Sequence, residues 1–129
     1  MASAGDFTRA ASCYKGCKAQ FDAMIKAAVA EDFPGVEWGP PECNDLPFLF
    51  LGELFRIALW MTADDGDYLG AFCVSKLLDG KDNWVRLGPI LTINEDGAIA
   101  GGGQHFLIQR GMSHILAFIL EPCLPKPLP

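Results

Sequence analysis

The hydrophobic and polar positions of residues 6–31 repeat with the period of an α-helix. Apolar side chains recur three and four positions apart and share one face: Phe7, Ala10, Cys13, Tyr14, Cys17, Phe21, Met24, Ile25 and Ala28. Charged residues such as Lys15 and Lys26 fall on the other face. This spacing is typical of an amphipathic helix that lies on a core. We therefore predict one long helix, capped by Asp6 and ended by the sequence Phe33-Pro34-Gly35.

A second helical pattern fills residues 105–121, between three consecutive glycines and Pro122. At about 100° per residue, the apolar side chains of this stretch fall within an arc of about 180°. They are Leu107, Ile108, Gly111, Met112, Ile115, Leu116, Phe118 and Ile119. Polar residues such as Gln109 and Glu121 fall on the opposite arc. We predict a helix over the whole stretch, with its broad apolar face on the rest of the domain.

Between the two helical patterns the periodicity changes. Residues 33–47 are rich in proline and glycine, which predicts a stiff connecting loop. In the second half of residues 48–62, Phe55, Ile57, Leu59 and Met61 occupy alternate positions, and the residues between them are also largely apolar. This fits a strand covered on both faces, although a helix beginning at Asp45 is the competing interpretation. We favour the strand because aromatic and branched residues are dense here.

Aspartate- and glycine-rich turn signals then recur about every 15 residues, a spacing typical of hairpins. They lie at residues 64–67, 79–83 and 94–97. Together with 54–62, the apolar runs that they separate predict a meander of about four antiparallel strands. Pro89 indicates a bulge or a sheet edge in the run 84–93. The run 68–78 also has helical spacing, so a helix stays open there.

These elements together predict a single α+β domain over residues 1–129. The long N-terminal helix and the C-terminal helix would cover one face of the antiparallel sheet. Trp60, Phe72 and Trp84 make the strands apolar on both sides, which suggests that another subunit covers the second face. Residues 122–129 are rich in proline and predict an extended tail.

Composition limits the classes of partner. The chain of 129 residues has a formal net charge of −6, and its acidic residues are spread along the chain. This argues against binding to nucleic-acid phosphates, which requires clustered Lys and Arg, and it permits a basic protein partner. The apolar runs are interrupted by charged residues and are too short to span a membrane. The chain has five cysteines, an odd number without regular spacing, and shows no signal-peptide pattern, so we expect a cytoplasmic protein.

The residues that most often bind metals are poorly placed to do so. Cys13 and Cys17 have the spacing of half a metal site, but they fall on an apolar helical face and are better interpreted as buried structural thiols. His105 and His114 would point in opposite directions on the predicted helix. The aspartate-rich turns lack the ligand spacing of a calcium loop. We expect no metal and no cofactor, and we assign no catalytic residue.

The triple glycine and one helical stripe are the remaining candidates for a site. Gly101, Gly102 and Gly103 could bind an anion through backbone amides, or could simply form a strand-to-helix turn. The stripe has spacings of four, three, four and three residues, typical of a helix that meets a second partner. It contains Phe106, Arg110, Ser113, Ala117 and Leu120. It would either pack under the proline-rich loop or the tail, or form a protein interface that includes His114 and Trp38.

We therefore expect a small acidic protein that binds another protein, of the inhibitor, immunity, adaptor or secretion-chaperone type. The partner would be a symmetric second copy or a different protein. The alternative is a small-molecule-binding or enzymatic domain. In that case Gly101–Gly103 would hold an anion and His105 or His114 would act as the acid–base group. Neither hypothesis rests on a recognised motif.

Overall fold

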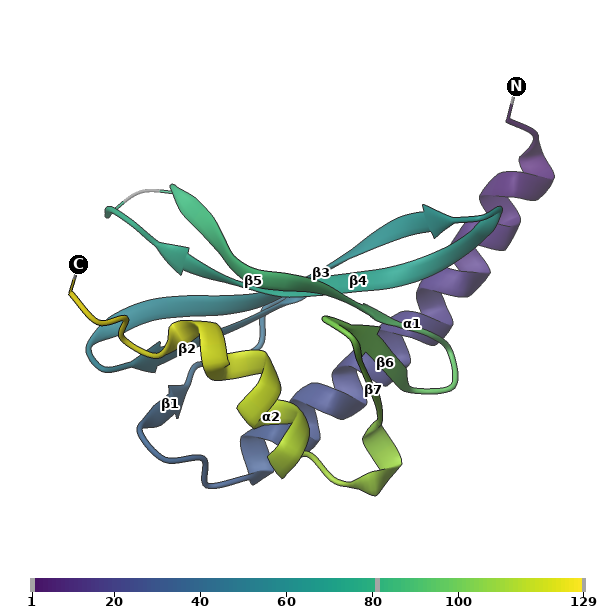
Figure 1. The fold of residues 1–129 in the computed structure, drawn as a ribbon. Helices are drawn as coiled ribbons and strands as arrows, with labels where there is room; N and C mark the ends of the chain where they lie inside the picture. Colours follow the sequence, from purple (N-terminus) through teal and green to yellow (C-terminus); the bar gives the residue numbers. More distant parts are fainter. Residues whose placement is uncertain (1, 81, 129) are drawn as a thin grey trace.

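The computed structural model describes residues 2–80 and 82–128 and has the predicted α+β architecture (Figure 1). A long N-terminal helix, an antiparallel meander and a C-terminal helix packed on the sheet are all present. The order is α1 (Ala4–Ala30), β1 (Val36–Trp38), β2 (Asp45–Phe50), β3 (Glu53–Asp64), β4 (Asp67–Leu77), β5 (Trp84–Ile93), β6 (Ala98–Gly101), β7 (Gln104–Leu107), η1 (Ile108–Arg110), α2 (Ser113–Leu120) and η2 (Glu121–Cys123).

Helix α1 begins slightly earlier than predicted, because Ser3 rather than Asp6 is its N-cap. The Asp6 backbone N–H donates to Ser3 Oγ at 3.3 Å, and the Ser3 backbone N–H donates to Asp6 Oδ2 at 2.9 Å. The two residues form a capping box, which satisfies amide groups that the first helical turn leaves free. The Ser3 backbone N–H and the Ser3 hydroxyl, which lies 3.2 Å from Asp6 Oδ2, both donate to the Asp6 carboxyl group and lower its pKa.

The sheet contains more strands than the four or so expected. Within the described residues it has seven, in the order β1 to β7, each antiparallel to the next, and it curls into half a barrel. Both open alternatives are decided in favour of strands: residues 68–78 form β4, and β2 and β3 share residues 48–62. The proline-rich stretch 33–47 is more than a loop, since it contains β1 and the start of β2.

Turn geometry explains how the strands follow one another so tightly. Each of three two-residue turns has both residues at positive φ, the left-handed conformation that type I′ hairpins require. The φ values are 54° and 78° at Leu51-Gly52, 51° and 84° at Asp65-Gly66, and 57° and 77° at Gly102-Gly103. The bulge indicated by Pro89 is confirmed, because the register between β4 and β5 shifts between Phe72 and Val74.

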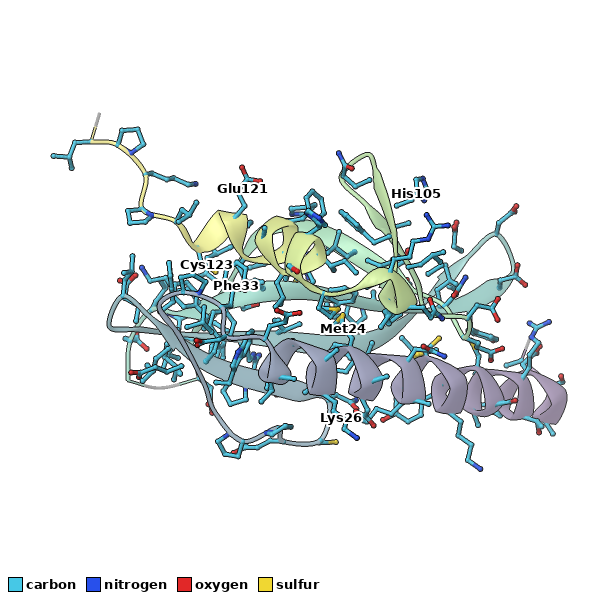
Figure 2. All side chains as sticks on the ribbon, turned by 90° about the horizontal axis from the view of Figure 1, so that it is seen from below. Met24, Lys26, Phe33, His105, Glu121 and Cys123 are labelled. Carbon is cyan, nitrogen blue, oxygen red and sulfur yellow. The ribbon has the colours of Figure 1, made fainter. Side chains whose placement is uncertain are left out.

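The core lies between the helices and one face of the sheet. Ile57 pairs with Val74 and Leu59 with Phe72, and all four side chains are buried under the helices. Phe21 of α1 packs against Phe72 with ring centroids 6.0 Å apart. Figure 2 looks onto this side of the molecule, where α1 and α2 lie across the sheet. Phe72 therefore belongs to the helix-covered face and not to the second face on which the sequence pattern placed it.

The predicted helix over 105–121 is wrong in its first half. Residues 104–107 form β7, 108–110 form η1, and only Ser113–Leu120 form α2. Phe106 pairs with Ile99 across the hairpin, so the chain gains a ladder of backbone hydrogen bonds that a helix there would forgo. Gly111 has a φ of 103°, outside the helical region, and it turns the chain from η1 into α2.

The predicted extended tail also begins later than expected. Its first residues, Pro122 and Cys123, belong to η2, and residues 124–128 form no helix or strand. Leu124 has φ and ψ values of −65° and 142°, close to polyproline II.

Candidate functional site

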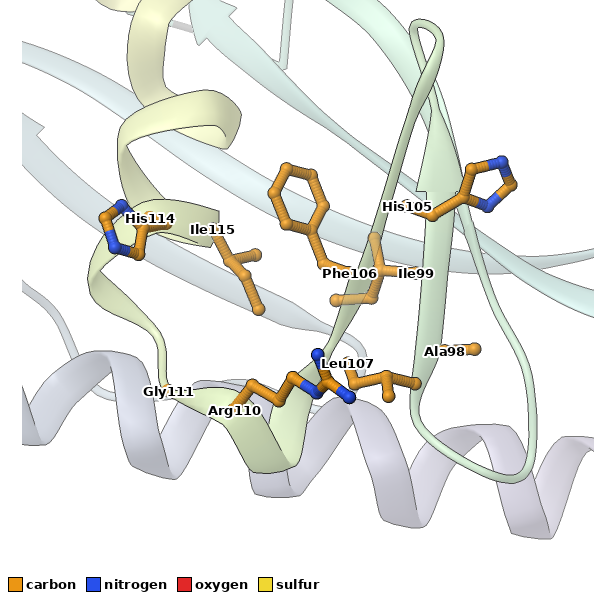
Figure 3. Close-up of a pocket in the computed structure, with 9 residues that line it drawn as sticks. All are labelled: Ala98, Ile99, His105, Phe106, Leu107, Arg110, Gly111, His114 and Ile115. Atoms are coloured by element: carbon orange, nitrogen blue, oxygen red, sulfur yellow. The ribbon is translucent and has the colours of Figure 1, made fainter.

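A pocket of about 390 Å³ lies between the β6–β7 hairpin, η1 and α2 (Figure 3). We call it the hairpin pocket. It is lined by Ala98, Ile99, His105, Phe106, Leu107, Arg110, Gly111, His114 and Ile115. Its residues come from both strands of the hairpin and from the chain that follows it, so a single continuous segment of sequence builds the whole site.

Aromatic packing sets the distance between the hairpin and α2. Phe106 projects from β7 toward α2 and meets Phe118, with ring centroids 5.3 Å apart and the rings tilted by 45°. Ile99 and Ile115 are buried beside this contact and give the pocket an apolar floor. Because aromatic pairs prefer such tilted geometry, the contact ties the hairpin to α2.

The rim of the hairpin pocket carries nitrogen-containing side chains. Arg110 ends η1, His114 lies in the first turn of α2, and both are exposed. In the described part of the chain no carboxylate forms an ion pair with Arg110, and the pocket lining contains no acidic residue. An acidic protein thus presents a locally basic rim above an apolar floor.

Strand β7 is an edge of the sheet with free backbone groups. The Ile108 N–H donates to the Gly97 carbonyl at 3.2 Å, which makes Ala98–Leu107 a pair without mutual hydrogen bonds. Because bonded and non-bonded pairs alternate in an antiparallel ladder, His105 and Leu107 point their N–H and C=O groups away from β6. No described strand pairs with β7 on that side. An open strand edge therefore lies beside the hairpin pocket.

The structure divides the predicted interface into separate places. Phe106, Arg110 and His114 meet at the hairpin pocket, whereas Ser113 is exposed and does not line it. Leu120 is buried and lines, with Ala117, a different cavity of about 170 Å³.

That second cavity lies against the loop after α1, close to Phe33 and Cys123 (Figure 2). Trp38 lies in β1, and its ring is tilted by 57° against that of Phe48, with centroids 5.3 Å apart. It also lines a third cleft with Lys26. The continuous stripe predicted from 106 to 120 does not exist, because its first residue belongs to a strand.

The two histidines lie on opposite sides of the hairpin pocket, with rings pointing away from one another (Figure 3). His105 belongs to β7 and His114 to α2. Among the described residues, no group of three or more His, Cys, Asp and Glu side chains is close enough to hold a metal ion.

The triple glycine is a strand-to-strand turn instead of the predicted strand-to-helix turn. A Cβ atom on Gly101 would lie 2.6 Å from Leu91 Cδ2 and 2.8 Å from the Ile90 carbonyl oxygen. Gly102 and Gly103 supply the two positive φ angles of the turn. Close packing and turn geometry thus account for all three glycines without a bound anion.

The cysteines of α1 contact the sheet through their thiols. Cys13 donates to the Tyr68 carbonyl at 2.8 Å, and Cys17 donates to the Ile93 carbonyl at 3.4 Å. Desolvation, together with the neighbouring Cys17 thiol, raises the pKa of Cys13 to about 11. Burial likewise raises the pKa of Cys123 to about 11. Both groups are neutral thiols at pH 7, a form that is a poor nucleophile and a poor metal ligand.

Sequence reasoning missed the floor and the open edge of this site. Ile99 and Ile115 were assigned only to a predicted strand and to the predicted apolar helical face. A hairpin signal was present, because Gly102-Gly103 separates the short apolar run 98–100 from Phe106 and Leu107.

Comparison with models of protein families, with characterised proteins and with solved structures gave no significant match. In the described residues, no helix combines the length and the apolar character needed to cross a membrane.

Proposed function

We propose that this protein is a protein-binding module that captures an extended segment of its partner along β7. The observation that carries the proposal is the hairpin pocket lying directly beside an open strand edge. An extended peptide that adds to a sheet edge gains backbone hydrogen bonds, and neighbouring pockets select its alternate side chains. Here the β7 edge would bind the backbone of the peptide, and the hairpin pocket would bind one of its side chains.

The backbone supplies affinity in this arrangement. His105 and Leu107 each offer one N–H and one C=O to an incoming strand, as the ladder alternation requires. Such groups promote uncontrolled strand pairing if they are left open on a long edge. Because β7 spans only Gln104–Leu107, it suits a short recognition segment better than a long sheet-to-sheet contact.

The side chains define the chemistry of the segment. An apolar side chain of the partner would fill the floor beside Phe106, and an acidic side chain would pair with Arg110 on the rim. The net charge of −6 permits a basic partner overall, but the charge at this surface favours an acidic segment. The five free cysteines support a reducing compartment, so we place the interaction in the cytoplasm.

The enzymatic alternative receives less support from the geometry. A solvent-open cleft that holds one of the histidines beside a carboxylate would favour it. The lining of the hairpin pocket includes both His105 and His114 but no Asp or Glu. A general acid or base there would lack the carboxylate partner that commonly orients an imidazole.

Selection of peptides from a random displayed library tests the proposal. We expect enriched peptides to combine an acidic residue with an apolar residue in an extended pattern. Arg110→Glu should weaken a selected peptide by on the order of tenfold, equivalent to about 1.4 kcal/mol. The control is Lys15→Glu, which makes the same charge change at an exposed position of α1 and should leave affinity unchanged. Equal losses in both variants would contradict the proposal.

A second pair of variants separates the backbone contribution from the side chain. His105→Pro removes the free N–H at the strand edge, a position where proline is tolerated because the group bonds to no other strand. His105→Ala removes the imidazole and keeps the donor. We expect His105→Pro to abolish peptide binding and His105→Ala to retain it. Binding by a folded His105→Pro protein, confirmed by circular dichroism, would rule out strand addition at this residue.

A further inference from the structure

The sheet face opposite the helices carries a second, unrelated surface. In Figure 1, α1 and α2 lie on one side of the sheet, and none of the described residues forms an element over the other side. The register places large side chains of β3, β4 and β5 on this outward side. We call it the open face, defined by Leu54, Arg56, Trp60, Leu77, Trp84 and Arg86.

Small residues in the central strand β4 leave room for the large side chains of its two neighbours. Ala71, Cys73 and Ser75 of β4 point outward, yet their exposed fractions are only 1%, 4% and 9%. Because no described helix lies above these three residues, side chains from the neighbouring strands must shield them from solvent. The strands on either side, β3 and β5, carry the tryptophans and arginines of the open face.

Arginine and tryptophan stack in two pairs across this layer. The Arg56 guanidinium lies over the Trp84 ring, 4.2 Å from its centroid, and Arg86 lies over Trp60 at 5.4 Å. Each of these cation–π contacts joins a side chain of β3 to one of β5, across the central strand β4. Both tryptophans stay partly exposed, and Trp and Arg are the residues most enriched at the energetic centres of interfaces.

The charges on the outward side are arranged in a self-complementary way. Asp45 on β2 and Glu37 on β1 lie at one side of this surface. Arg86 on β5 lies at the other side. Arg56 on β3 already pairs with Asp45 at 3.6 Å. The outward side of the sheet therefore carries both positive and negative side chains, although the whole protein has a net charge of −6. A second copy can therefore approach this face without the repulsion expected elsewhere.

We propose that two copies of this chain pair through their open faces. A two-fold axis running along the strands, above β3 and β4, sets the β5 of each copy over the β2 of the other. Arg86 then reaches Asp45 of the partner subunit, and the two-fold axis repeats this ion pair with the two copies exchanged. The tryptophan–arginine stacks form the centre, and face-to-face sheets pack about 10 Å apart.

The dimensions approach those of a stable contact. β3, β4 and β5 run side by side for about nine residues, or about 30 Å, and β2 adds six residues. The flat footprint is roughly 500 Å² before side-chain relief is included. Typical stable interfaces bury about 800 Å² per partner. The dimer uses the sheet face and leaves the β7 edge free, so this inference and the proposed peptide binding can fail independently.

Sedimentation equilibrium of the full chain, from about 1 to 100 μM, tests the dimer. We expect a mass approaching twice the 14.0 kDa of the monomer. Arg86→Glu should raise the dissociation constant at least about tenfold, because it places a carboxylate opposite Asp45. Lys15→Glu, which adds the same charge away from the open face, should leave the dissociation constant unchanged. Arg86 is exposed, so the variant should keep its circular dichroism spectrum and its peptide affinity.

Trp60→Ala provides an independent variant on the same face. It removes one stack and should also favour the monomer. A wild-type chain that stays monomeric at 100 μM would overturn the inference, as would a dimer that survives both Arg86→Glu and Trp60→Ala.

Discussion

Replacing Phe72 with alanine probes the packing between α1 and the sheet. Phe72 is 0% exposed at the middle of β4, and its ring meets Phe21 of α1 at 6.0 Å. Truncating a fully buried phenylalanine costs about 3–5 kcal/mol, through lost burial and the cavity that remains. We therefore expect Phe72→Ala to lower the free energy of unfolding by about 4 kcal/mol. This is a large part of the roughly 5–15 kcal/mol that stabilises a typical domain.

Urea unfolding followed by circular dichroism measures the effect. With a slope of about 2 kcal/mol per molar urea, a loss of about 4 kcal/mol lowers the midpoint by about 2 M. Phe7→Ala is the matched control, because Phe7 lies on the same helix face in the sequence pattern but is 72% exposed. We expect this control to change the free energy of unfolding by less than about 0.5 kcal/mol.

The comparison can fail in two ways. A loss below about 1 kcal/mol for Phe72→Ala would mean that the residue is not enclosed between α1 and the sheet. A comparable loss of unfolding free energy for Phe7→Ala would mean that Phe7 is buried in a contact and is not exposed. The first result would refute the placement of the core on the helix side of β4, and the second would refute the exposure of Phe7.

Two further predictions concern the contact of the helices with the sheet. A Cβ atom on Gly70 would lie 2.8 Å from Ile93 Cγ2 and 3.2 Å from Cys17 Cβ, so Gly70→Ala should lower the free energy of unfolding by about 1–3 kcal/mol in the same urea assay. The pKa of Cys123 is raised from 9.0 to about 11, so the folded state holds the thiol proton more tightly. This stabilisation is complete below pH 9 and is lost as the pH rises toward 11. Thermal unfolding from pH 8 to 11 should therefore show a decline that Cys123→Ala reduces, and an unchanged decline would exclude this thiol as a source.

The sequence correctly predicted those elements in which the hydrophobic period and the stop or turn residues indicate the same structure. Residues 6–31 combine a helical period with a stop signal, and α1 spans almost the same stretch. The aspartate- and glycine-rich signals marked real turns, such as Asp65-Gly66 with its two positive φ angles. The same logic missed the turn at Leu51-Gly52, because leucine rarely adopts a positive φ and gives no turn signal. The meander was consequently predicted with too few strands.

The candidate site was only partly predictable, for a physical reason. Over 105–121 the apolar period satisfied the test for a helix, and α2 does occupy Ser113–Leu120. Residues 104–107 could form a helix or a strand by their local preferences. They form β7 because they pair with β6, and this pairing is a tertiary contact that the local pattern does not reveal. Phe106, Arg110 and His114 do line one pocket, but a hairpin and a short helix bring them together instead of one long helix, and their role in binding stays a prediction. The buried floor could be recognised only after the hairpin was known.

Amide hydrogen exchange at β7 is the most direct test of peptide capture. In the free protein, we expect the His105 and Leu107 amides to exchange rapidly, because they point away from β6, and the Phe106 amide to exchange slowly, because it pairs with Ile99. A saturating selected peptide should slow exchange at His105 and Leu107 by at least about tenfold and leave Phe106 slow. Unchanged exchange at both edge amides, in a sample that binds the peptide, would contradict strand addition at β7.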